Sequence, residues 1–394
     1  MTPILSRALV LRFVSLVGAS VSFFLPLAVI PMYAGSTSAA GWANGALLIA
    51  TVLGELVTPR LVVRIGYRWA LAIGLVLLGA PALALLVTPA LPVVLAVGIV
   101  RGVGFAITIV AGGALTATLI PAERRGEGLA IVGLVSGIPS LLALPLGVWL
   151  ADHWGFGVVF VVTALAPLAA VVTVPGLPER DASAGGTHGV LSGLRNGALT
   201  RPATVFAAAA AAVGVVVTYL PLAVGGHSGW VAPVALLVQP GVATAGRWVA
   251  GKLGDRRGQQ RLLVPSVALS AAGMALIAVT GSPMLVIAGA ALLGAGFGVL
   301  QNATLSLMYA RVPAAGYGTV SAIWNAAYDL GMAAGAIGVG MLVATTGFSV
   351  AFLCTAALLV PALVMAWREA RHPLRIERRI SSSLSRPAFS RAAN

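Results

Sequence analysis

The segment Gly251-Lys252-Leu253-Gly254-Asp255-Arg256-Arg257-Gly258 is short and highly charged, and it stands between two long apolar runs near residues 229–251 and 261–281. A helix needs ~20 apolar residues to cross the ~30 Å hydrocarbon core of a bilayer. Each flanking run meets that requirement. The segment therefore predicts a polar turn between two membrane-spanning helices.

The rest of the chain repeats this alternation of apolar runs and short polar breaks. Of its 394 residues, 59% are hydrophobic and only 9% are charged, whereas soluble domains carry roughly 25% charged residues. Twelve spans are predicted, near 9–31, 41–59, 69–88, 92–118, 127–150, 156–175, 203–224, 229–251, 261–281, 284–310, 318–345 and 348–367.

We therefore predict an all-α membrane protein with twelve transmembrane helices in two six-helix bundles. Residues 1–175 form the N-terminal bundle and residues 203–367 the C-terminal bundle. The polar stretch 176–202 is interpreted as a cytoplasmic linker, and 368–394 as a basic cytoplasmic tail.

The basic residues follow the predicted topology. The predicted outer loops contain no Lys or Arg; they lie around 35–40, 88–91, 152–155, 225–228, 281–283 and 345–347. Positive charge accumulates in cytoplasmic loops of membrane proteins, so both termini are expected in the cytoplasm, in a bacterial inner membrane. The net charge of +14 is spread between apolar runs and forms no basic face for nucleic acid.

The chain also resembles itself at an offset of 192 residues. Glu55–Gly66 overlays Arg247–Gly258, and Arg101–Phe105 overlays Leu293–Phe297. The pair Gly155-Phe156 overlays Gly347-Phe348 at the same offset. With six spans in each half, equivalent ends lie on the same side of the membrane, which indicates a parallel repeat.

These residues resemble the motifs of the major facilitator superfamily. The segment 251–258 is similar to the family's loop motif Gly-x-x-x-Asp-Arg-x-Gly, and the first copy keeps Arg64 and Gly66 but has Val63 in place of the aspartate. Arg101-Gly102-Val103-Gly104 is similar to the family's helix-4 signature. The antiporter pattern of helix 5 is broken within residues 133–147, which leaves the direction of transport open.

The resemblance implies roles for both motifs. The gating motif would comprise Gly251, Asp255, Arg256, Gly258, Arg64 and Gly66. In the family the loop aspartate holds the outward-facing state through a helix N-terminus and nearby arginines. The helix-4 arginine is implicated in proton transfer in proton-coupled exporters, and Arg101 matches it.

Five ionisable residues lie inside predicted spans: Arg12, Glu55, Arg101, Arg247 and Asp329. A charge at the bilayer centre costs roughly 2.5–3.5 kcal/mol on insertion scales, so each one needs a partner, a wet cavity or an escape route. Arg12 is expected to extend its guanidinium to the cytoplasmic surface. For Glu55 and Arg247, structural ion pairs or contacts to the loops stand beside a transport role.

Arg101 and Asp329 lie deepest, ten or eleven residues inside their spans, or ~15 Å at 1.5 Å per residue. We interpret Arg101 as holding a carboxylate or an anionic substrate, and Asp329 as a carrier that binds and releases a proton. Structural helix contacts are the alternatives for both.

The polar candidates for a substrate cavity are Gln239, Gln301, Asn302, Trp324 and Asn325. Amide side chains inside a membrane often join helices, so a structural role is the leading reading for this group.

Together these features predict a secondary active transporter that exports a small drug-like or antibiotic-like compound by alternating access, coupled to protons. The alternative is a proton-coupled symporter that imports a metabolite or an organic anion. No nucleotide-binding loop and no paired-carboxylate cluster occur in the sequence, so neither an enzyme nor an ATP-driven pump is expected. We expect no cofactor and no metal; the expected partners are the substrate, protons and lipid, and the chain is expected to act as a monomer.

Overall fold

A computed structural model describes residues 6–120, 125–177, 196–225, 229–313 and 316–371. Within these ranges all regular secondary structure is helical and there is no strand. This agrees with the predicted fold class.

The N-terminal half contains six spans. The first is broken near Pro26 into α1 and α2, because proline lacks the N–H that would continue the helix. The second and third spans are joined in α3. The elements are α1 (Arg7–Phe24), α2 (Val29–Tyr33), α3 (Thr37–Gly79), η1 (Ala80–Leu86), α4 (Leu91–Leu119), α5 (Arg125–Trp154), α6 (Phe156–Val171) and η3 (Val174–Gly176).

The C-terminal half also contains six spans, and its first helix begins at Gly197, inside the stretch predicted as linker. The elements are α8 (Gly197–Val224), α9 (Val231–Arg257), α10 (Gln260–Ile277), α11 (Pro283–Tyr309), α12 (Tyr317–Thr346) and α13 (Phe348–Ala370). Ten segments of the described chain are long and apolar enough to cross a membrane. Spans 2 and 3 are counted together in this number because α3 joins them, and span 8 is not counted because α9 is more polar. With these two spans added, all twelve predicted spans are present.

Glycines in a left-handed conformation mark equivalent turns in the two halves. Gly66 (φ 76°) and Gly258 (φ 86°) end spans 2 and 8, and Gly155 (φ 83°) and Gly347 (φ 80°) separate spans 5 and 11 from the next span. Only glycine adopts these angles without strain. Each pair is separated by the 192-residue offset, so the repeat in the sequence is also a repeat of backbone geometry.

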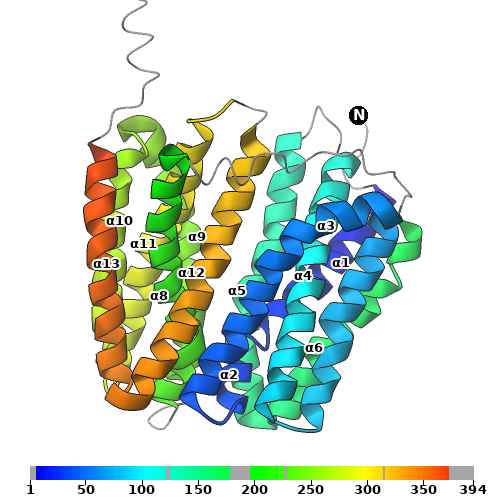
Figure 1. Cartoon of the computed structure of the whole chain (residues 1–394), viewed down its shortest axis with the longest axis horizontal. Coiled ribbons are helices and arrows are strands. Elements are labelled where there is room, and N and C mark those ends of the chain that lie inside the picture. Colours follow the sequence, from blue (N-terminus) through cyan, green and yellow to red (C-terminus); the bar gives the residue numbers. More distant parts are fainter. Residues whose placement is uncertain (1–5, 121–124, 178–195, 226–228, 314–315, 372–394) are drawn as a thin grey trace, which may run out of the picture.

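The two halves stand side by side, with α8–α13 on one side and α1–α6 on the other (Figure 1). They meet along a surface that we call the seam, where α3 packs on α12 and α8, and α5 packs on α9. The start of α1 and the end of α13 lie at the same end of the bundle (Figure 1). We call this the terminal end, and the opposite end, where α3 begins, the distal end.

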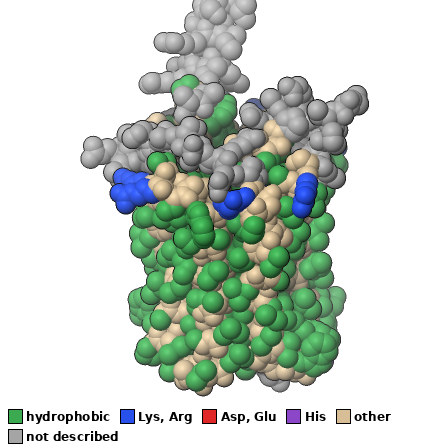
Figure 2. All heavy atoms as spheres, turned by 90° about the vertical axis from the view of Figure 1, so that its right-hand side faces the viewer, with side chains coloured by type: hydrophobic (Ala, Val, Ile, Leu, Met, Phe, Trp, Pro, Cys, Tyr) green, Lys and Arg blue, Asp and Glu red, His purple; other side chains and the backbone are tan. Residues whose placement is uncertain are grey.

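On the face shown in Figure 2, the visible Lys and Arg side chains lie at the terminal end, above a largely apolar body. The exposed basic residues with described side chains include Arg7, Arg60, Arg64, Arg201, Lys252, Arg256, Arg261, Arg368 and Arg371. The described turns of the distal end contain no Lys or Arg. Such an asymmetric, apolar cylinder is the expected shape of a multi-pass membrane protein.

Candidate transport site

The distal part of the seam is closed by hydrogen bonds between the halves. Asn44 on α3 donates through Nδ2 to Thr218 Oγ1 on α8 at 3.0 Å, and also to the backbone oxygen of Leu27 at 2.9 Å. The Tyr219 hydroxyl on α8 lies 3.3 Å from the backbone oxygen of Thr37 across the seam, and 2.5 Å from that of Ala336 within the C-terminal half. These polar groups are buried, so the halves are in direct contact here without a polar gap.

Glycines allow the helices to approach this closely. A Cβ added at Gly41 would collide with the backbone oxygen of Ala336 and with the Tyr219 hydroxyl. Gly45 faces the side chain of Ile337 in the same way, and Gly340 faces Tyr219. Small residues permit such approach between membrane helices, and this end of the seam depends on them.

Farther toward the terminal end, the seam brings together two carboxyl groups from opposite halves. Asp329 on α12 is 9% exposed, and its charge interacts with that of Glu55 on α3. Glu55 is half-buried. Asn325 lies one turn from Asp329 on the same helix face and is exposed.

The Asp329 carboxyl also belongs to a chain of polar groups within the C-terminal half. Tyr328 interacts electrostatically with both Asp329 and Arg247, and Arg247 donates through Nη2 to Thr244 Oγ1 at 2.9 Å. The predicted alternatives for Glu55 and Arg247 were structural ion pairs. Among the described residues neither forms a salt bridge.

Aromatic rings pack beside this chain. The ring of Phe206 stacks on Trp324 at a centroid distance of 4.4 Å, and on Phe297 and Tyr328 at 5.6 and 6.0 Å. Trp324 also donates through Nε1 to Thr304 Oγ1 at 3.1 Å. These four rings form the aromatic cluster: Phe206, Phe297, Trp324 and Tyr328.

Some of the amide side chains proposed for the substrate cavity are buried between helices, and others are exposed. Gln239 is buried, and the Oε1 atom of Gln301 is buried without a hydrogen-bond partner. Asn302 accepts from Ser306 Oγ at 3.3 Å, whereas Asn325 is exposed on the seam side of α12. Of the predicted cavity residues, Trp324 and Asn325 share α12 with Asp329.

Arg101 lies away from this group, inside the N-terminal half. It is completely buried and donates through Nε to the backbone oxygen of Leu78 (3.1 Å) and through Nη2 to that of Ser22 (2.5 Å). Its Nη1 atom is buried without a partner. In this state its partners are backbone carbonyls of α1 and α3, and no carboxylate among the described residues pairs with it.

The expectation that Arg12 extends to the membrane surface is wrong. Arg12 is 1% exposed and donates to the backbone oxygen of Gly112 at 3.1 Å and to Ser15 Oγ at 2.9 Å. The physical reason is Gly112, because any side chain there would overlap the guanidinium. The missing Cβ gives the cation a place to bury among internal acceptors.

The predicted gating motif lies on the turn from α9 to α10, with Gly258 ending α9. Arg256 is exposed, and the Asn302 side chain lies 3.7 Å from a Cβ built at Gly251. The side chain of Asp255 lies outside the described residues. In the first copy Arg64 is exposed and Gly66 forms the turn.

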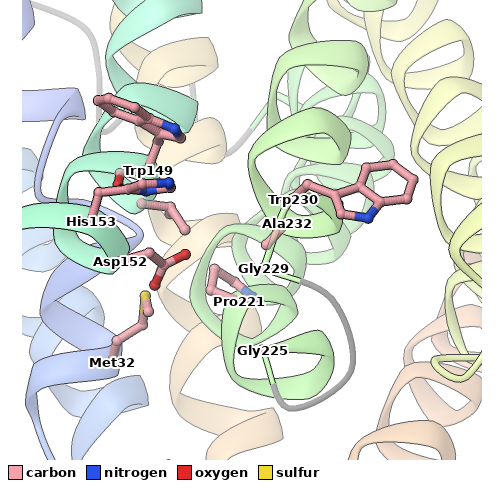
Figure 3. Close-up of a pocket in the computed structure, with 10 residues that line it drawn as sticks. Met32, Trp149, Asp152, His153, Pro221, Gly225, Gly229, Trp230 and Ala232 are labelled. Atoms are coloured by element: carbon pink, nitrogen blue, oxygen red, sulfur yellow. The ribbon is translucent and has the colours of Figure 1, made fainter.

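A cavity of about 420 Å³ lies between the halves at the distal end. Asp152 and Trp149 of α5 face the turn from α8 to α9, with Asp152 pointing toward Pro221 and Gly229 (Figure 3). His153 interacts through Nδ1 with the backbone oxygen of Trp149 at 2.9 Å. The closed seam therefore ends in a small, mostly apolar pocket that contains Asp152 and His153.

The model of the Major Facilitator Superfamily matches residues 9–336 and 242–391. The chain belongs to this family.

Two relatives in the superfamily carry drug-resistance names. A chloramphenicol resistance protein of Streptomyces lividans is 30% identical over 340 residues, covering 80% of this chain and 83% of that protein. A multidrug resistance protein MdtG of Escherichia fergusonii is 26% identical over 274 residues, covering 66% of each chain.

Solved structures of superfamily transporters share the fold. The nucleoside transporter NupG has a TM-score of 0.75 at 13% identity, covering 94% of this chain and 100% of that one. The xylose transporter XylE from E. coli, in a partially occluded inward-open conformation, has a TM-score of 0.72 at 14% identity, covering 92% and 97%. The chain is thus a transporter of the major facilitator superfamily and not an enzyme.

Sequence reasoning missed the residues that close the seam of this superfamily member. Asn44, Thr218 and Tyr219 are polar groups within apolar spans, and that was the available signal. Gly41 and Gly45 form a small-xxx-small pattern, which marks close helix contacts in membranes. Neither signal says which helix is the partner.

Proposed function

We propose that this transporter exports a small, largely apolar organic compound in exchange for protons. The observation that carries the proposal is the placement of two carboxyl groups from opposite halves along the seam, buried Asp329 and half-buried Glu55, which interact electrostatically. Drug-resistance relatives at 30% and 26% identity support the direction and the substrate class.

The acid pair would couple protons to the movement of the halves. Two negative charges repel strongly where little water screens them, so a proton on the pair stabilises the contact of α3 with α12. Loss of that proton favours separation of the two helices. Proton binding then biases one state of an alternating-access cycle, which is the thermodynamic requirement for coupling.

The aromatic cluster would supply the surface for the compound. Ring-shaped apolar molecules stack on aromatic side chains, and Trp324 and Tyr328 lie beside Asp329 on α12. A flat, weakly charged antibiotic fits this chemistry better than a sugar, which needs many hydrogen-bonding groups.

The orientation is part of the proposal. Because the exposed arginines gather at the terminal end, the positive-inside bias places that end in the cytoplasm, here of a bacterial inner membrane. The distal closure would then block the outer side of the membrane. Residues 1–175 and 203–367 would move as two bodies, and the gating motif would stabilise the opposite, outward-facing state.

The test is a transport assay in vesicles with an imposed pH gradient, with chloramphenicol as the first compound. Addition of substrate should dissipate the gradient in the direction of exchange. Asp329→Asn and Glu55→Gln should each abolish this proton flux, whereas Asp181→Asn, which removes a carboxylate from the polar segment between the halves, should leave it intact. Proton flux in the same direction as the compound would instead establish the import alternative.

A further inference from the structure

A second pocket lies at the terminal end of the C-terminal half, where the first turns of α8 meet the last turns of α13. The two helices pack against each other and stand next to one another in the fold (Figure 1). The pocket has a volume of about 490 Å³ and is lined by Arg201, Met365, Trp367, Arg368 and Arg371. Of the lining side chains that the structure describes, three are cations and none is an anion.

The charge of this pocket is not neutralised within the described chain. Glu369 is the acidic residue adjacent in sequence, but it is buried and its Oε1 accepts from Arg311 Nη2. Arg311 also donates to the backbone oxygen of Ala198 at 2.6 Å. Among the described residues, the three pocket arginines form no salt bridge. Three guanidinium groups around one hollow repel each other, and an anion between them removes that cost.

One of the three arginines is held in place by an aromatic ring. The guanidinium carbon of Arg371 lies 3.5 Å from the ring centroid of Trp367, which is a favourable cation–π geometry. Tryptophan is enriched where a protein crosses the membrane–water boundary. The pocket therefore lies at the level where lipid headgroups are found.

An apolar stripe leads along α13 directly to the pocket. Val360, Val364 and Arg368 follow at intervals of four residues, so they share one helix face. Val360 is 55% exposed and Val364 is 46% exposed. An extended hydrocarbon chain on this stripe would end with its polar head among the arginines.

We propose that this pocket binds the phosphate group of an anionic phospholipid, whose acyl chain lies along the exposed face of α13. Arginine suits this role because its planar group donates two parallel hydrogen bonds to phosphate oxygens. The apolar stripe selects a lipid over free phosphate. The site is independent of the proton pair and of the direction of transport.

The experiment uses the full chain in a neutral detergent and measures binding by native mass spectrometry. Phosphatidylglycerol is compared with phosphatidylcholine of the same acyl chains. The pocket variant is Arg201→Gln/Arg368→Gln/Arg371→Gln. The control Arg7→Gln/Arg60→Gln/Arg261→Gln removes the same charge from exposed positions at the same end.

The pocket variant should lose about tenfold in affinity for phosphatidylglycerol, since basic side chains near an anionic headgroup each add attraction. The control should change less than about twofold. Equal losses in both variants would overturn the proposal, as would equal binding of phosphatidylcholine to the unmodified protein. Displacement of the lipid by inorganic phosphate at equal concentration would show a phosphate site and overturn the lipid assignment.

A single variant, Arg368→Gln, and a melting curve of each protein keep the result interpretable. If the triple variant melts far below the control, lipid affinity is compared for the single variant instead. No loss of lipid affinity in the single variant, with normal melting, also contradicts the site.

Discussion

The two parts of the seam are built in different ways. At the distal end, contact depends on glycines and on the hydrogen bonds from Asn44 to Thr218 and from Tyr219 to Thr37, and all of these groups are neutral. Toward the terminal end, the seam holds two acidic groups from opposite halves, Glu55 and Asp329, which interact electrostatically. Neutral contacts make a closure whose strength does not vary with protonation, whereas acidic contacts make one that does. Under the proposed function, one interface would combine a closure that is insensitive to protonation with one that depends on it.

The most direct test of the difference between the two parts of the seam is to neutralise the acid pair. Asp329→Asn should abolish coupled transport, a loss of about a hundredfold or more, because the amide neither binds nor releases a proton. Exchange of labelled for unlabelled compound across the membrane should persist, since it needs no net proton movement. Measuring both fluxes on one preparation distinguishes loss of coupling from loss of folding. Coupled transport at the original rate would refute the proton-coupling role of Glu55 and Asp329.

A substitution at the distal end should act on conformation and leave the proton chemistry in place. In Gly41→Val the new side chain collides with the backbone of Ala336, so the state with a closed distal end is disfavoured, and we expect transport to fall about tenfold. A thiol introduced by Thr37→Cys, in a Cys354→Ala background, should react faster with a membrane-impermeant reagent added from the distal side.

Gly338→Val is the matched control for this substitution. A Cβ at Gly338 meets nothing within 4 Å, so both transport and thiol reactivity should stay near the original values. Equal defects in the two valine variants would mean that added bulk, and not the Gly41 contact, is responsible.

The hydrogen bond between the halves should have a smaller effect. Asn44→Ala removes the bond to Thr218 and leaves buried partners without a donor, which costs ~1–3 kcal/mol. The matching variant Thr218→Val and the double variant complete a thermodynamic cycle. We expect a coupling of roughly 0.6 kcal/mol, the usual value for such bonds in membranes, read from the thiol-labelling equilibrium.

The smallest effect is expected for Tyr219→Phe. The hydroxyl donates to the backbone oxygen of Ala336, and its loss should cost about 0.5–1.5 kcal/mol while the ring keeps its packing. The melting temperature in detergent should fall slightly and transport should remain. A complete loss of transport would place this hydroxyl in the substrate path.

Much of the architecture could be predicted from sequence because its signals are local. Span lengths, the charge-free distal loops and the repeat are all visible without knowing any contact, and paired turns such as Gly66 and Gly258 confirm the repeat. Depth alone was enough to select Asp329 as a candidate. Glu55 could also be selected as a candidate, but its position near Asp329 could not be predicted, because contacts between halves depend on how two bodies dock and leave no periodic pattern.

The buried arginines show the same limit. Depth predicted a surface position for Arg12 and a charged partner for Arg101, but backbone oxygens of Gly112, Leu78 and Ser22 are the observed partners. Every residue carries a carbonyl, so sequence does not reveal which one accepts. For Arg12, the absence of a side chain at Gly112 was the decisive fact, and it becomes informative only when the helices are placed.

The glycine turns at the distal end also determine how the protein can be handled. Between α5 and α6 the chain reverses at Gly155 alone, and between α12 and α13 at Gly347 alone. At these two turns almost no loop residues are therefore available for an antibody or a protease to bind from this side. An epitope tag intended for that side is better inserted among residues 278–282, a five-residue connection between α10 and α11.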